Sequence, residues 1–360
     1  MGVEQPGTAR AVWIDVVRGL CVIAVVMLHV RIFVYDPSVP EIDGADEWRR
    51  ITEAFGPFRL PTLFTISGLL VAGRVRQGWS DRRNAVRVVS SYWLYLVWLT
   101  VFALMSLAVT APGMPFRLET PTDYLRQIVL PDTILWFVLA LAVYVLVLTS
   151  LQRVPPTVVL GGLALLAALS GVAPAELAEE QWLHILYYGV FFAAGVYLPG
   201  AVRWFAGGRV VVKLGCALAL FLVLERVWQL TEMGTALESS VRLVRDLVAV
   251  AVAVGLCALI ARAAWLARPL ALVGRRTLPI YILQLPAIWL LCLVPVVADL
   301  HDAPVVFALG PVLGTAFVVA ASMLGFTLVR GTVLENLFRL PRPLADRILT
   351  PPSVSRTDAR

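Results

Sequence analysis

Long apolar runs recur along the whole 360-residue chain, and they constrain its fold more than any other feature. A helix needs about 17 or more mostly apolar residues to cross the ~30 Å hydrocarbon core of a bilayer. A mean hydropathy of +0.83, with 59% hydrophobic and 15% charged residues, lies far outside the range of soluble domains. We therefore expect an all-α integral membrane protein, a single bundle of about ten transmembrane helices. The predicted spans lie near residues 14–35, 57–75, 86–111, 133–151, 156–174, 184–202, 209–228, 241–261, 277–297 and 304–328.

The charged residues predict the orientation of these spans. Arginines gather in every second loop and in the C-terminal tail, whereas the other loops are acidic or poor in arginine, as in 41–47, 175–180 and 298–303. The positive-inside rule then puts the arginine-rich loops and both termini in the cytoplasm. The net charge of +6 is distributed among alternate loops and is not gathered in one patch. It therefore indicates how the helices are oriented in the membrane, and we expect no nucleic-acid partner. No segment is long enough to separate domains, so residues 1–330 are predicted to form one membrane domain and 331–360 a short cytoplasmic tail rich in Arg and Pro.

Two ionisable residues interrupt the first apolar run. Arg18 and His29 are eleven residues apart, so on a helix they share one face and differ in depth by ~16 Å. With the N-terminus inside, Arg18 lies near the inner surface and His29 beyond the midplane. Such groups are costly at membrane depth unless they have a partner or a task. A neutral imidazole there can serve as a general base.

Structural roles for both residues stay open. Arg18 could snorkel to the inner headgroups with Asp15 as its partner, and His29 could hydrogen-bond a neighbouring carbonyl. The other two histidines, His184 and His301, fall at the outer edge of a span or in an outer loop. His29 is therefore the one histidine predicted at membrane depth.

Motifs in the first two spans and in the last but one resemble those of a known family. The pattern W-I-D-x-x-R-G followed by His29 resembles the first helix of the membrane acyltransferase-3 superfamily, which includes sugar O-acetylases of bacterial glycans. The segment FRLPTLFTISG (58–68) is similar to its second helix, with Arg59 where many members have His. LVGRRTLPIYILQ (272–284) is similar to its late motif, with Thr277 for Ser and Gln284 where His is usual.

Three further segments match in the same order along the chain. RRNAVRVVSSYW (82–93) resembles the family's arginine-rich entry to the third helix, and TILWFVLAL (133–141) its L-W-F segment. YYGVFFAAGVYL (187–198) is similar to its aromatic sixth helix. The resemblance thus covers nearly the whole chain.

The resemblance implies an O-acetyltransferase of the bacterial cytoplasmic membrane. Such an enzyme moves an acyl group, typically acetyl, from cytoplasmic acyl-CoA to a hydroxyl of a glycan or glycolipid on the outer side. The co-substrate would be acetyl-CoA, with no metal. The amide of Gln284 can position a hydroxyl or carbonyl but cannot act as a base, so the base role falls on His29. A variant in which His29 is itself acylated stays open.

The remaining candidates would bind the acyl-CoA or the acceptor. Arg18, the deepest arginine, is expected to contact CoA. The CoA phosphates could also meet Arg82, Arg83 and Arg87, unless these arginines only face lipid headgroups. Ser67 could donate to the thioester carbonyl or simply let two helices approach. Trp136, Tyr281 and Gln284 are candidate substrate contacts, with packing as the other reading.

A charged set at the outer ends of the seventh and eighth spans allows two readings. It comprises Glu225, Arg226, Arg242, Arg245 and Asp246, and Arg242 and Asp246 are spaced to pair on one helix. The set could close the bundle with an interhelical ion pair or form a polar floor for a sugar acceptor. A different function, a proton-coupled transporter or a flippase for a polar substrate, would also use a buried histidine and arginines.

Overall fold

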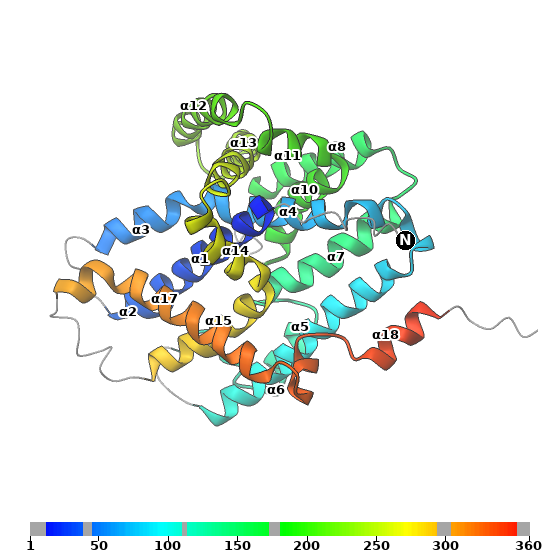
Figure 1. Cartoon of the computed structure of the whole chain (residues 1–360), viewed down its shortest axis with the longest axis vertical. Coiled ribbons are helices and arrows are strands. Elements are labelled where there is room, and N and C mark those ends of the chain that lie inside the picture. The colour runs from blue at the N-terminus through cyan, green and yellow to red at the C-terminus, as the bar shows by residue number, and fades with distance from the viewer. Residues whose placement is uncertain (1–11, 39–44, 110–113, 173–180, 294–303, 351–360) are drawn as a thin grey trace, which may run out of the picture.

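The computed structural model describes residues 12–38, 45–109, 114–172, 181–293 and 304–350, and that part of the chain is built from helices without strands (Figure 1). The α-helices are α1 (Val12–Val30), α2 (Asp36–Ser38), α3 (Ala45–Ala54), α4 (Gly56–Val75), α5 (Arg83–Ala108), α6 (Pro121–Gln127), α7 (Trp136–Ser150), α8 (Pro156–Leu169), α10 (Gln181–Tyr197), α11 (Pro199–Ala206), α12 (Val210–Gln229), α13 (Ala236–Ile260), α14 (Ala264–Arg275), α15 (Thr277–Cys292), α17 (Pro304–Val329) and α18 (Arg342–Leu349). Short 3-10 helices are η2 (Gly78–Ser80), η3 (Ser170–Val172) and η5 (Val333–Leu337), and η1 (Arg31–Tyr35) is a π-helix.

Every predicted span coincides with a helix, but not all of these helices are long enough to cross a bilayer. In the part of the chain that the structure describes, five are long and apolar enough, and a sixth is if the bent pair α10 and α11 counts as one span. The helices α7, α8 and α15 are apolar but shorter. The number of ten crossings, like the cytoplasmic position of both termini, therefore stays a prediction. The predicted acidic loops 175–180 and 298–303 lie outside the described residues.

One predicted span and one predicted loop differ from the sequence-based expectation. The segment predicted as one span over 184–202 bends by 81° between α10 and α11, so it is not a single straight helix. The bend follows from Pro199, which has no N–H to continue the ladder of α10. The segment 264–275, predicted as part of an arginine-rich loop, forms the helix α14 and packs against α1.

Glycine contacts bring two helix pairs unusually close. A Cβ on Gly68 of α4 would lie 2.1 Å from the carbonyl oxygen of Phe192 in α10, and one on Gly195 would lie 2.0 Å from that of Thr65. The same relation joins α1 to α14 through Gly19 and Gly274. Helices associate in membranes through such small residues because their backbones can then touch. These contacts fix how α1 and α4, the helices that carry the candidate site, sit in the bundle.

The residues after 330 pack back onto the bundle. Trp98 of α5 donates its Nε1–H to the carbonyl of Leu337 at 2.7 Å, and its ring lies 5.1 Å from that of Phe338. Arg82 reaches the end of α18, where it donates to the carbonyl of Thr350 at 2.8 Å. The tail is thus tied along α5 (Figure 1).

Candidate active site

His29 lies in the last turn of α1, just before the α-helix gives way to a π-helix. Residues Arg31–Tyr35 form the π-helix η1, and Arg31 pairs with Asp36 across it at 3.1 Å. A π-turn inside a helix is costly and is found frequently at functional sites. Because α1 is regular over Val12–Val30, Arg18 and His29 do share one face, and both are half-buried.

The imidazole of His29 is held by Gln284 of α15. Nδ1 of His29 lies 3.0 Å from Oε1 of Gln284, whose Nε2 donates to the carbonyl of Tyr281 at 2.8 Å. That carbonyl can only accept, so the amide nitrogen must face it and Oε1 must face the imidazole. Nδ1 therefore carries a proton, and in the neutral imidazole Nε2 keeps its lone pair. Gln284 is completely buried, so this arrangement is shielded from water.

Aromatic and charged groups surround the imidazole. The Phe33 ring lies 5.6 Å from it and 5.3 Å from the ring of Phe116. Arg59 of α4, half-buried, is close enough to act on His29 electrostatically. The site thus combines an oriented imidazole with a nearby cation, which favours a negative charge developing beside it.

Trp136 and Tyr281 belong to one aromatic cluster between α7, α10 and α15. The rings of Trp136 and Tyr188 stack with 6.0 Å between their centroids. The ring centroids of Phe137 and Tyr281 lie 5.1 Å apart. The Tyr281 hydroxyl donates to the carbonyl of Ile134. Tyr281 is thereby committed to packing, although its own carbonyl orients Gln284.

Ser67, Arg82 and Arg83 make hydrogen bonds or ion pairs with groups other than His29. The hydroxyl of Ser67 donates to the carbonyl of Leu63 in its own helix at 2.7 Å, so its proton is already in use. Arg83 pairs with Asp81 at 2.8 Å, and this hydrogen bond holds the pKa of the Asp81 carboxyl below its usual range. Arg87 is half-buried on α5 and close to Arg74.

A polar cavity of about 620 Å³ opens where α3 and α4 meet α10, α12 and α13. Four arginines, three carboxylates and two large aromatic residues are among its lining. They are Arg50, Arg59, Arg242, Arg245, Glu53, Glu225, Asp246, Tyr188 and Trp228. Arg59, which acts on His29, makes this cavity a neighbour of the imidazole.

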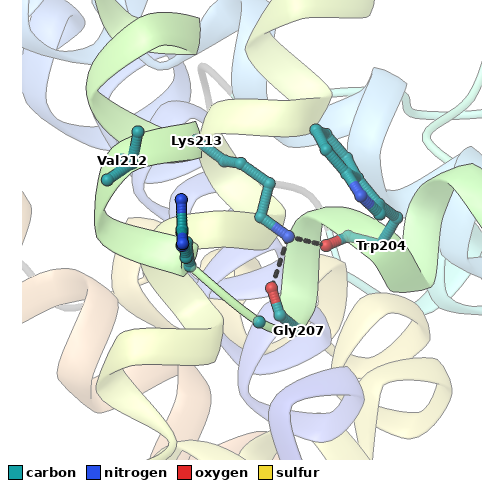
Figure 2. A pocket seen from close by; sticks show the side chains of 6 residues that line it. Trp204, Gly207, Val212 and Lys213 are labelled. Carbon is teal, nitrogen blue, oxygen red and sulfur yellow. Dashed lines mark hydrogen bonds between the residues drawn. The ribbon is translucent and has the colours of Figure 1, made fainter.

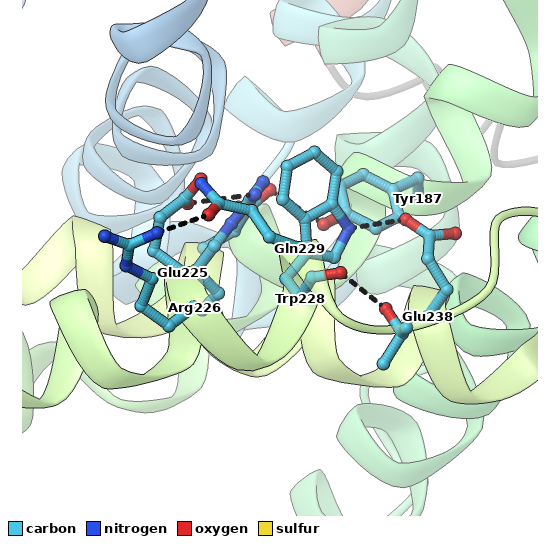
Figure 3. A network of polar contacts seen from close by, with 9 residues as sticks. Tyr187, Glu225, Arg226, Trp228, Gln229 and Glu238 are labelled. Atoms are coloured by element: carbon cyan, nitrogen blue, oxygen red, sulfur yellow. Dashed lines mark hydrogen bonds and ion pairs between the residues drawn. The ribbon is translucent and has the colours of Figure 1, made fainter.

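A network of ion pairs forms one wall of this cavity (Figure 3). Arg245 pairs with Glu225 of α12 at 3.2 Å and with Asp246 at 2.8 Å, and its guanidinium lies 4.2 Å over the Trp228 ring. Tyr187 donates to Asp246 at 2.8 Å. The close ion pair of Asp246 is made by Arg245 and not by Arg242, which acts on Asp246 electrostatically from more than 4.0 Å. The interhelical ion pair that the sequence suggested is therefore made by Arg245.

A second pocket, beside α11, is of a different kind (Figure 2). The ammonium of Lys213 donates to the carbonyls of Trp204 and Gly207 and lies 4.2 Å over the Trp204 ring. These carbonyls are at the C-terminal end of α11, where a cation is stabilised by the helix dipole. Lys213 is thus a cap for a short helix, and the pocket has no link to His29.

The family model Acyl_transf_3, described as an acyltransferase domain, matches residues 11–330. The chain belongs to the acyltransferase-3 family. Neither the curated proteins nor the solved structures gave a significant match. This acyltransferase is a multi-pass membrane protein, since its long apolar helices accompany a membrane family.

Two residues that line the cavity lie in sequence motifs of the acyltransferase. Arg59 lies in the second-helix motif, where many members have His. Tyr188 lies in the sixth-helix motif, next to Tyr187. The signal available was their position at the same predicted end of two spans as Glu225 and Asp246. Glu53 carried no motif and could be found only from the fold.

Proposed function

We propose that this acyltransferase moves an acyl group, most simply acetyl, from cytoplasmic acyl-CoA to a hydroxyl of an extracytoplasmic glycan or glycolipid, with His29 as the base. One observation carries the proposal: the Gln284 amide, itself oriented by the Tyr281 carbonyl, leaves Nε2 of His29 as a proton acceptor. A histidine used only for packing has no need of a fixed tautomer. An oriented general base is worth about 10²–10⁴ in rate.

In the proposed reaction Nε2 of His29 takes the proton of the acceptor hydroxyl. The hydroxyl oxygen attacks the thioester carbonyl, the C–S bond breaks, and CoA leaves as the thiolate. The proton then passes from His29 to that thiolate or to water, which regenerates the base.

The proposal is tested by comparing the organism that carries the chain with a deletion strain. Mass spectrometry of their glycans and lipids should find that one class of molecule has lost an acyl group in the deletion strain. For acetyl this loss lowers the mass by about 42 Da. Purified protein should release CoA from acetyl-CoA when that molecule is added. Movement of an unmodified substrate across the membrane, with no CoA release, would favour a transporter or flippase instead.

Gln284 is predicted to be a positioning residue for His29. Gln284→Leu removes the acceptor for Nδ1–H, so the imidazole can rotate and change tautomer, and we expect kcat to fall by about 10–100-fold. Gln284→His, which restores an acceptor nitrogen, should recover part of this loss. The pH dependence of kcat is the second readout. A purely structural role predicts lower protein yield in Gln284→Leu but an unchanged pH profile and kcat.

The orientation of the site is predicted from the charge of the loops. In a variant whose native cysteines are replaced by Ala, Glu47→Cys should react with an impermeant maleimide in intact cells and Ser80→Cys should not. Both positions are exposed, so access to the reagent depends only on the side of the membrane. Labelling of Ser80→Cys alone would put the polar cavity on the cytoplasmic side and contradict outward transfer.

A further inference from the structure

The two guanidiniums that face the polar cavity without an ion-pair partner are those of Arg59 and Arg242. Within the described residues, neither has a carboxylate oxygen within 4.0 Å. Arg245 takes both Glu225 and Asp246, and Arg50 pairs with Glu47 at 2.9 Å. Arg59 donates only to the carbonyl of Thr52, at 2.9 Å. Among the described residues, Arg245 and Arg50 are thus closely ion-paired, whereas Arg59 and Arg242 meet carboxylates only at longer range. Glu53 acts electrostatically on Arg59, and Asp246 and Glu238 act on Arg242.

These two arginines act on the same side chain. The phenol of Tyr188 interacts electrostatically with both Arg242 and Arg59. Arg242 also lies 4.6 Å over the ring of Tyr187, which fixes its direction. Both guanidiniums are half-buried, where a cation with no close ion pair gains most from a bound anion. A pair of converging arginines in this state suits a carboxylate or phosphate group.

The rest of the cavity suits a sugar. Glu53 and Glu225 offer acceptors for hydroxyl groups, and Trp228 and Tyr188 offer ring surfaces. The volume of about 620 Å³ lies within the range of small-molecule sites, ~300–1,000 Å³. Arg59 of α4 lines the cavity and acts electrostatically on His29 of α1, the helix packed against α4. A molecule held by the arginine pair therefore lies next to the helix that carries His29.

We infer that the acceptor is an anionic sugar, one that bears a carboxylate or a phosphate, and that Arg59 and Arg242 bind this group. The inference rests on the proposed function, because it names the class of the acceptor. Glu225, which is ion-paired with Arg245, forms part of the wall of this binding site. The negative group and the hydroxyl that is acylated belong to the same molecule.

The test measures equilibrium binding to the full-length protein in phosphatidylcholine nanodiscs. The probes are glucuronic acid, glucose 1-phosphate, inorganic phosphate and glucose. We expect at least one charged sugar to bind about tenfold or more tightly than glucose and inorganic phosphate, with an affinity that falls as salt is raised. Arg59→Gln and Arg242→Gln should each weaken that binding by about tenfold or more. Arg226→Gln is the matched control, because Arg226 is exposed on α12 outside the cavity, and it should bind like the wild type.

Several outcomes would overturn the inference. These are equal binding of glucose, equal binding of inorganic phosphate, unchanged binding in both Arg variants, or no binding of either charged sugar. Loss of binding in phosphatidylglycerol nanodiscs would also overturn it, because a lipid headgroup would then occupy the arginines. Binding of a charged sugar without CoA release would leave the inference standing and contradict the proposed function. Acyl transfer to neutral sugars alone would contradict the inference and leave the proposed function standing.

Discussion

His29→Ala is expected to reduce acyl transfer by about 10²–10⁴-fold, the contribution of a positioned general base. The reason is the lone pair on Nε2, which only the tautomer fixed by Gln284 presents. The measurement is CoA release by purified protein in the presence of its acceptor. Insertion and yield should stay near those of the wild type, because the apolar length of the first span is unchanged.

Two further variants separate chemistry from packing. His29→Ala leaves the Oε1 of Gln284 without its donor, at a cost of about 1–3 kcal/mol of stability. His29→Gln can keep that hydrogen bond yet has no imidazole, so it should be stable and equally inactive. His184→Ala, a histidine 6.0 Å from the Trp136 ring and on another helix, should keep most of the activity. Normal turnover in His29→Gln would exclude the imidazole from the reaction.

The sequence predicted where the helices lie but not how far each one continues. Apolar runs indicate segments that are buried in lipid or protein, and the structure has a helix at each of the ten positions that they predicted. They could not reveal the 81° bend before Pro199, because proline is tolerated in membrane helices when neighbours satisfy the freed backbone groups. They also missed α14, whose arginines made it resemble a loop.

The sequence indicated His29 and Gln284 as candidate site residues, but not their contact. His29 is the one histidine predicted at membrane depth, and Gln284 is a departure from the family pattern. Their contact joins residues 255 positions apart, which no local pattern contains. The close partners of Asp246 were not predictable for a related reason, since helical spacing allows Arg242 while those partners, Arg245 and Tyr187, depend on side-chain direction and on a second helix.

The close contact of α4 and α10 should be the part of the fold most sensitive to one added methyl group. In Gly68→Ala the new Cβ would lie 2.1 Å from the carbonyl oxygen of Phe192, and backbone cannot move aside as a flexible side chain can. We expect a loss of about 3 kcal/mol or more, seen as a lower melting temperature and poor recovery from detergent. Gly73→Ala, on the same helix with nothing within 4 Å, should gain about 0.5–1 kcal/mol. Because α4 carries Arg59 and α10 carries Tyr188, whatever Gly68→Ala protein folds should also bind the acceptor more weakly. Equal melting temperatures for the two variants would mean that this glycine contact does not hold the cavity together.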